Sequence, residues 1–295
     1  MLEHLNATSQ RPNRIVILGA AGFVGSATKA AFEAEGTPTL ALGRDQVDLL
    51  TENASDTLAG HLRDTDCFVV ISAEAPCKDA AMLERNIRMM RAITDAIAKV
   101  QPAHLIYVSS DAVYADSMKP LSETSCAEPG SLHGIMHLAR EVMLKDAMKG
   151  PLAILRPTLI YGAADPHNGY GPNRFRRLAA EGRSIVLFGE GEERRDHVDV
   201  KDVAELIRLI AGHRSTGVLN AATGTVTSFR EIADLVVDLS SNKVSVDSSP
   251  RQGAMPHNGY RAFNPAATAA AFPGFRYTSL AEGLARAENE MKESV

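Results

Sequence analysis

The chain has 295 residues, of which 45% are hydrophobic and 23% are charged, and its formal net charge is −5. This length is enough to bury a full core, and it suits one large α/β domain or such a domain with a smaller lobe. The slight acidic excess argues against nucleic acid and against an anionic membrane as the main partner. A phosphorylated small molecule can still bind local basic residues.

The cysteines and the N-terminal residues indicate the cellular compartment of the protein. Cys67, Cys77 and Cys126 are odd in number and widely spaced, which argues against a disulfide framework and indicates a reducing compartment. Residues 1–13 are polar and lack the apolar run of a secretion signal, so we expect a flexible N-terminal extension. No apolar run reaches the roughly 18–20 residues that a membrane span needs. We therefore expect a cytoplasmic protein without a membrane partner.

From residue 14 onward, short β-branched runs alternate with longer helical patterns. Strands are expected at 15–18, 39–42, 67–71, 105–108 and 153–155. Helices are expected at 23–35, 79–99 and 132–148. This alternation is typical of βαβ units and a parallel sheet. The first half of the chain therefore predicts an α/β protein with a Rossmann-type, doubly wound parallel sheet.

The pattern changes after residue 157. Residues 161–173 are rich in Gly, Pro and Asn, which predicts a long loop of the kind that often carries function. The following elements are expected to be a helix at 173–182, a strand at 185–188, a charged turn at 189–196, a helix at 201–212, a strand at 217–220, and helices at 228–239 and 278–292.

These elements predict two parts of the protein. The Rossmann domain is expected to comprise residues 14–160 with returning segments 196–221, and a small C-terminal substrate-binding lobe is expected to comprise 161–195 and 222–295. A ligand should then bind between them, at the carboxyl ends of the strands.

A glycine-rich turn joins the first strand to the first helix. Gly19 allows the tight turn, Gly22 lets the backbone approach a pyrophosphate, and Gly25 allows close packing of helix on sheet. Phe23 and Val24 begin the helix whose N-terminus faces the phosphates. Placed between a strand and a helix in an alternating chain, this pattern predicts a dinucleotide site.

The end of the second strand indicates which dinucleotide binds. A cofactor's ribose would lie here, and Arg44 is suited to pair with a 2′-phosphate, which favours NADP over NAD. In the alternative, Arg44 is a solvated loop residue and Asp45 accepts from a free 2′-hydroxyl. Asp48 and Leu49 are candidates for covering the adenine, or for starting the next helix.

Three further segments strengthen this interpretation. Residues 109–114 read Ser-Ser-Asp-Ala-Val-Tyr, residues 156–162 read Arg-Pro-Thr-Leu-Ile-Tyr-Gly, and residues 194–199 read Arg-Arg-Asp-His-Val-Asp. With the glycine turn, they resemble the extended short-chain dehydrogenase/reductase family of nucleotide-sugar epimerases, dehydratases and reductases. The resemblance runs from about residue 14 almost to the C-terminus, and it implies an enzyme that uses NADP or NAD.

The resemblance implies roles for particular residues. Ser110 takes the position of the catalytic serine, while Pro157 and Leu159 take positions beside the nicotinamide. Arg195 matches the arginine that holds a nucleotide-sugar phosphate, and a solvated turn charge is the alternative. Further assignments are Ala73 and Glu74 to the cofactor, and Asn173, Phe175, Leu187 and Arg261 to the substrate.

The sequence departs from the family at the helix that should supply Tyr-x-x-x-Lys. Residues 129–137 place His133 on the tyrosine, which is the family's general acid/base, and His137 on the lysine, which holds the nicotinamide ribose. Positions four apart share one helix face, so the two histidines keep the geometry of the pair that they replace. Imidazole titrates near neutrality, so His133 is suited to pass a proton and His137 to donate to a ribose hydroxyl.

Other interpretations of these residues stay open. Asp111 matches an acid that protonates a leaving hydroxyl in some dehydratases of the family, but Ala112 stands where a glutamate normally follows it. His133 and His137 are suited to hold a metal ion, although no third ligand is evident nearby, and we predict no metal site. The same pair is compatible with a protein that binds the cofactor but has lost catalysis.

The sequence thus predicts an NAD(P)-dependent oxidoreductase or epimerase that acts on a nucleotide sugar or a related polyol by hydride transfer. The alternative is a non-catalytic NAD(P)-binding regulatory or sensor protein. By analogy with the family, the helices near 79–99 and 130–149 are expected to pair in a homodimer.

Overall fold

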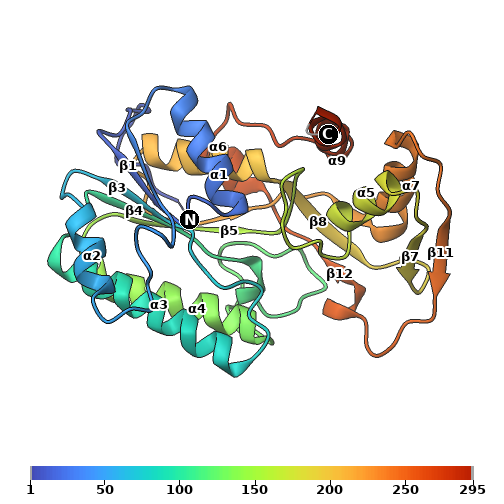
Figure 1. Ribbon diagram of the computed structural model, residues 1–295, viewed down its shortest axis with the longest axis horizontal. Coiled ribbons are helices and arrows are strands. Elements are labelled where there is room, and N and C mark those ends of the chain that lie inside the picture. The colour runs from blue at the N-terminus through green and yellow to red at the C-terminus, as the bar shows by residue number, and fades with distance from the viewer. Residues whose placement is uncertain (1, 294–295) are drawn as a thin grey trace.

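A six-stranded parallel sheet lies at the centre of the protein, with strand order β2-β1-β3-β4-β5-β9 (Figure 1). The computed structural model describes residues 2–293. The strands are β1 (Ile15–Leu18), β2 (Thr39–Leu42), β3 (Cys67–Val70), β4 (His104–Val108), β5 (Leu152–Pro157) and β9 (Gly217–Ala221). Their sequences are nearly continuous apolar runs because the sheet is covered on both faces.

Helices cover the two faces of this sheet. The helices α1 (Phe23–Ala34) and α6 (Val200–Gly212) lie on one face. The helices α2 (Ala54–His61), α3 (Ala80–Lys99) and α4 (Leu132–Ala147) lie on the other (Figure 1). This arrangement confirms the predicted Rossmann-type, doubly wound α/β fold.

A smaller unit is built around the strand β8 (Arg194–Asp199). This strand pairs with β6 (Leu159–Tyr161), β10 (Val226–Ser228) and β12 (Tyr260–Arg261). A separate two-stranded sheet joins β7 (Ile185–Phe188) to β11 (Val246–Ser249). The remaining elements are α5 (Pro172–Ala180), α7 (Phe229–Leu239), α8 (Ala266–Ala271), α9 (Leu280–Glu293) and the short helices η1 (Asp111–Val113) and η2 (Pro256–Gly259).

The structure corrects several predicted boundaries in the second half of the chain. The charged segment 189–196 is not only a turn, because β8 begins at Arg194 and pairs on both sides. Val198 of this strand already packs into the core of the Rossmann layers, and α6 starts at Val200. Phe272 and Phe275 pack onto the core formed by α1 and α6, so the C-terminal segment also covers the Rossmann sheet.

The N-terminal segment differs from the flexible extension that the sequence predicted. Glu3 forms an antiparallel bridge with Thr216, and the backbone amides of Asn6 and Gln10 donate to carbonyls at the end of α6. The imidazole of His4 is 2.8 Å from both the Ser215 hydroxyl and the Ala271 carbonyl oxygen. These contacts fix the segment against β9, although its polar composition gives no periodic signal.

A salt bridge in the interior ties α4 to the sheet. The Glu141 carboxylate accepts from Arg156 Nε at 2.9 Å and Nη2 at 2.6 Å, and from the Ser109 hydroxyl at 2.7 Å. Arg156 also donates to the Tyr114 hydroxyl at 2.8 Å, which donates to Asn220. The Glu141 side chain is fully buried, so the network links α4, the end of β4, β5 and β9 inside the protein.

In the part of the chain that the structure describes, no helix combines the length and the hydrophobicity that crossing a bilayer requires.

The close approach of α4 to η1 depends on Gly134. A Cβ atom there would lie 2.1 Å from the Ala112 carbonyl oxygen, so Gly134→Ala should destabilise the protein by about 1–3 kcal/mol in urea unfolding. The control is Gly60→Ala in α2, where an added Cβ would contact nothing. We expect this second variant to stabilise by about 0.5–1 kcal/mol. Equal changes in the free energy of unfolding of the two variants would contradict the close contact of Gly134 with Ala112.

Candidate active site

One large cavity of about 1230 Å³ opens at the carboxyl ends of the central strands. Its walls come from the glycine turn, the ends of β2, β3 and β4, the start of α4, and the small unit around β8. Ligands of open α/β sheets bind at this edge. The cavity thus joins the predicted cofactor site to the predicted substrate lobe.

The glycine turn has the geometry of a phosphate site. Gly19 has a φ of +96°, and a Cβ there would lie 2.7 Å from the Ser72 amide nitrogen. A Cβ at Gly25 would lie 2.1 Å from the Gly19 carbonyl oxygen, so this glycine serves helix packing and does not line the cavity. Residues 22–24 do line it, and no side chain caps the α1 N-terminus. The amides of Gly19, Ala20 and Gly22 donate within the protein, so it is the uncapped first turn of α1 that suits a pyrophosphate.

The end of β2 presents Arg44 to the same cavity. Its side chain is 69% exposed, and its guanidinium lies 3.9 Å from the Glu74 carboxylate, which Arg85 also binds at 2.8 Å. Asp45 is exposed and does not line the cavity. Arg44 is therefore an exposed cation at the position where a ribose phosphate would lie.

Other predicted cofactor residues lie around Arg44 and at the opposite wall. The cavity-lining residues of this set are Asp48, Leu49, Ala73, Glu74, Pro157 and Leu159. The carboxylate of Asp48 accepts from the Leu50 amide at 3.0 Å, so it shapes the turn before α2. Leu49 is nearly fully buried and offers an apolar surface to an adenine.

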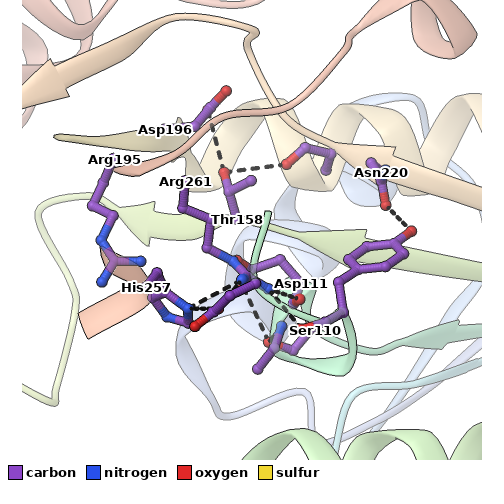
Figure 2. A network of polar contacts seen from close by, with 12 residues as sticks. Ser110, Asp111, Thr158, Arg195, Asp196, Asn220, His257 and Arg261 are labelled. Carbon is purple, nitrogen blue, oxygen red and sulfur yellow. Dashed lines mark hydrogen bonds and ion pairs between the residues drawn. The ribbon is translucent and has the colours of Figure 1, made fainter. Parts of the chain in front are cut away.

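Ser110 is the N-cap residue of η1 and lies two residues after the end of β4. Its hydroxyl oxygen accepts from the Ala112 amide at 3.1 Å, and its hydroxyl lies 3.4 Å from the Asp111 carboxylate. Both residues line the cavity (Figure 2). Because the contact between them is long, the Ser110 hydroxyl is able to reorient toward a substrate oxygen.

Asp111 is held by an arginine from the substrate side. Figure 2 shows Arg261 beside Asp111 and His257 next to Arg261, both from the segment 256–261. Arg261 Nε donates to the Asp111 carboxylate at 2.9 Å, and Nη1 donates to Asp116 at 3.0 Å. The Arg261 side chain is only 3% exposed. An ion-paired carboxylate accepts hydrogen bonds, so this arrangement argues against Asp111 as the proton donor of a dehydratase.

The two histidines of α4 lie side by side in the cavity wall. Their ring centroids are 4.7 Å apart, and the rings meet edge to face. His133 Nδ1 accepts from the Cys77 amide at 3.4 Å, and His137 Nδ1 lies 2.8 Å from the Tyr107 hydroxyl oxygen. No group of three or more potential metal ligands gathers within residues 2–293, so the pair has no third ligand there.

Both imidazoles are held neutral near pH 7. Burial lowers the pKa of His133, while the Asp111 carboxylate opposes this effect. The pKa of His137 lies well below its ordinary value because the ring is buried and because a charge on it would be repelled by Arg140 and by a protonated His133. Neither histidine therefore reproduces the fixed charge of the lysine that the family uses.

The substrate side of the cavity contains some of the predicted residues and not others. Arg195 lines it, 8% exposed, and donates from Nε to Glu193 at 2.7 Å. Asn173 lines it and accepts from the Gly162 amide at 3.1 Å. Phe175 and Leu187 are fully buried in the core between α5, β7 and α7, so their assignment to the substrate is corrected.

Sequence reasoning missed several residues of this site. His257, Asp116 and His197 line the cavity, but short strands and loops bring them there from separate segments. Tyr107 and Arg140 contact the histidine pair or its neighbours from the protein interior. Arg140 was detectable in principle, because it lies one helical turn beyond His137 and shares its face.

The fold and the glycine turn define a dinucleotide-binding α/β protein. A family model described as the NAD dependent epimerase/dehydratase family matches residues 15–222. The match covers more than half of the chain, and the chain belongs to this family. It is therefore an NAD(P)-dependent enzyme of the extended short-chain dehydrogenase/reductase type.

Solved structures of similar proteins share the whole fold. UDP-glucose 4-epimerase from Thermotoga maritima, solved with UDP-glucose, is 20% identical with a TM-score of 0.83, over 95% of this chain and 99% of that one. UDP-N-acetylglucosamine 4-epimerase from Methanobrevibacter ruminantium, in complex with UDP-N-acetylmuramic acid, is 19% identical with a TM-score of 0.82, over 97% and 100%. GDP-L-fucose synthetase from Naegleria fowleri, bound to NADP, is 16% identical with a TM-score of 0.82, over 99% and 96%.

The buried histidine of β8 predicts a dependence of stability on pH. Burial, aided by Arg195, lowers the pKa of His197 to about 3, so unfolding below pH 6.5 takes up a proton. The stabilisation that comes from keeping the His197 imidazole neutral is complete above that pH, and it is lost as the pH falls toward the folded-state pKa. Between pH 7 and pH 5 the free energy of unfolding of the wild type should fall by about 2 kcal/mol more than that of His197→Phe.

The measurement is urea unfolding of both proteins at each pH, with the exposed His167→Phe as the control variant. Parallel loss of stability in the wild type and in His197→Phe would refute this assignment.

Proposed function

We propose that this protein is an NADP-preferring oxidoreductase or epimerase that transfers hydride to and from a nucleotide sugar. This proposal rests on one continuous cavity, which runs from the glycine turn past Ser110 and His133 to Arg195. This continuity allows a dinucleotide and a second, phosphate-bearing ligand to meet near Ser110. The similar solved proteins that were crystallised with UDP-glucose or UDP-N-acetylmuramic acid support this substrate class.

The cofactor preference rests on Arg44. Its guanidinium lies at the cavity rim, whereas Asp45 does not line the cavity, so a 2′-phosphate is matched better than a bare ribose. The bound nicotinamide would supply the hydride acceptor and donor. The residues around the glycine turn would hold the pyrophosphate, and His137 would donate to the nicotinamide ribose.

Ser110 and His133 are proposed to act on the substrate oxygen. Since Nδ1 of neutral His133 accepts from the Cys77 amide, its proton lies on Nε2, which makes no hydrogen bond to the described residues. A neutral imidazole in this tautomer donates to a carbonyl oxygen and stabilises the charge that develops there. The Ser110 hydroxyl would provide the second donor. Proton transfer then requires His133 to change tautomer or to gain a proton.

The remaining proposals concern assembly and location. Ile135 and Val142 on α4 are large apolar residues with 42% and 58% exposure, as expected of a helix face that pairs with a second copy. We propose a homodimer formed through α3 and α4. The reduced cysteines are consistent with a cytoplasmic protein.

The cofactor assignment predicts a selective defect. Arg44→Ala should weaken NADPH binding by roughly 10- to 100-fold, since a charge-assisted contact to the 2′-phosphate is lost, and should leave NADH binding nearly unchanged. Fluorescence titration of the reduced cofactors measures both constants. Arg91→Ala is the control, because this arginine on α3 is 79% exposed outside the cavity. Equal losses for the two cofactors would refute the 2′-phosphate assignment.

The catalytic assignment predicts that turnover, and not cofactor binding, depends on the two donors. Ser110→Ala and His133→Asn should each lower turnover of the best nucleotide sugar by roughly 10²- to 10⁴-fold and leave the NADPH dissociation constant within a factor of about three. Product epimers and cofactor oxidation are measured together. Tight NADPH binding without turnover of any UDP- or GDP-sugar by the wild type would favour the sensor protein instead.

A further inference from the structure

Arg140 is a cation in the protein interior without a carboxylate partner. Its residue exposure is 0%, and no acidic side chain forms an ion pair with it among the described residues. Its Nη2 donates to the Ser72 carbonyl oxygen at 2.6 Å, its Nη1 lies 3.8 Å from the Met136 sulfur, and its Nε has no partner in residues 2–293. Burying a charge that has no ion-pair partner destabilises a protein, so the position of Arg140 calls for an explanation.

The position of Arg140 suggests what its buried charge interacts with. Ser72 lines the cavity, and its backbone is the surface against which Gly19 packs. The guanidinium therefore lies beneath the cavity floor, between the glycine turn and the histidine pair. A fixed positive charge at this depth is weakly screened and attracts the anionic dinucleotide.

Tyr107 controls the state of His137 from the same side. Burial raises the pKa of Tyr107 to about 12, so its hydroxyl keeps its proton. The only hydrogen bond of this hydroxyl to the described residues is the 2.8 Å contact with His137 Nδ1. A hydroxyl proton in the interior needs an acceptor, so Nδ1 accepts and Nε2 carries the imidazole proton toward the cavity that His137 lines.

We propose that Tyr107 and Arg140 are positioning residues of the cofactor site, in which Tyr107 holds His137 as a neutral Nε2–H donor to a ribose hydroxyl and Arg140 supplies the permanent positive charge that this histidine does not carry. The two functions that one lysine combines are thus divided between two residues of α4, one helical turn apart. The inference rests on the use of NAD(P) and not on the identity of the substrate.

The surroundings of His137 agree with this division. His133 and Arg140 on α4 both disfavour a charge on His137, and Tyr107 approaches it from β4. The nearby carboxylates are engaged elsewhere, since Glu141 pairs with Arg156 and Asp111 pairs with Arg261. The guanidinium lies 5.4 Å from the centre of the Tyr107 ring, so the arginine and the tyrosine also pack together.

The first test removes the charge and keeps the volume. Arg140→Met should weaken NADPH and NADH binding by roughly 10-fold, with nearly the same effect at low and high salt because a buried charge is weakly screened, and should move the His137 titration toward the ordinary histidine range. Arg140→Lys should restore both properties in large part. Arg91→Met removes an exposed charge from α3 and should change neither. Fluorescence titration gives the affinities, and NMR of the imidazole rings gives the titration, with His137→Gln to identify the signal.

The second test addresses the tautomer. In ¹⁵N spectra, His137 of the wild type should show a protonated Nε2 and an unprotonated Nδ1, and Tyr107→Phe should produce a mixture of the two tautomers with roughly 3- to 10-fold weaker NADPH binding. This variant removes one oxygen atom, so it tests the tautomer of His137 even if Arg140→Met does not fold.

The outcomes separate this inference from the proposed function. If the wild type binds NAD(P)H and the folded variants match it in affinity, His137 titration and tautomer, the inference is refuted and the function stands. If the wild type binds neither NADPH nor NADH, the proposed function and the cofactor role of these residues both fail.

Discussion

The buried salt bridge between Glu141 and Arg156 is the interaction on which the site depends. It fixes α4 against β5 and, through Ser109 and Tyr114, against the end of β4. The histidines are carried by α4, and Ser110 follows β4, so their mutual distance is set by this network and by the contact at Gly134. Removing one partner would leave a charge in the interior, which commonly costs about 3–5 kcal/mol.

Around this salt bridge, the two histidines proposed to act in the site are neutral, and the charged side chains lie next to them. His133 and His137 face the cavity without charge, Arg140 carries a charge beneath the floor, and the acidic Asp111 is neutralised by Arg261. A tyrosine and lysine pair combines proton transfer, ribose binding and positive charge in two residues. In the site proposed here the same tasks are divided among more groups, which would make the replacement of both residues compatible with a working site.

Most of the Rossmann half could be predicted from the sequence, because buried parallel strands give continuous apolar runs and Gly19, Gly22 and Gly25 occupy a diagnostic turn. The site was predictable wherever a motif fixed the spacing, as for Ser110 and the histidines. The small lobe was not, since β6, β10 and β12 have two or three residues each and carry no period. Phe175 and Leu187 were misassigned because this region has little motif content and its sequence does not reveal which face of each element turns inward.

The most direct measurement is a crystal structure of the complex with NADPH and a nucleotide sugar. Ser110 Oγ and His133 Nε2 should both lie about 3 Å from one substrate oxygen, with His137 Nε2 at the same distance from a hydroxyl of the nicotinamide ribose. A complex in which the sugar contacts Ser110 but His133 faces away from it would refute the proposed proton-transfer role of His133.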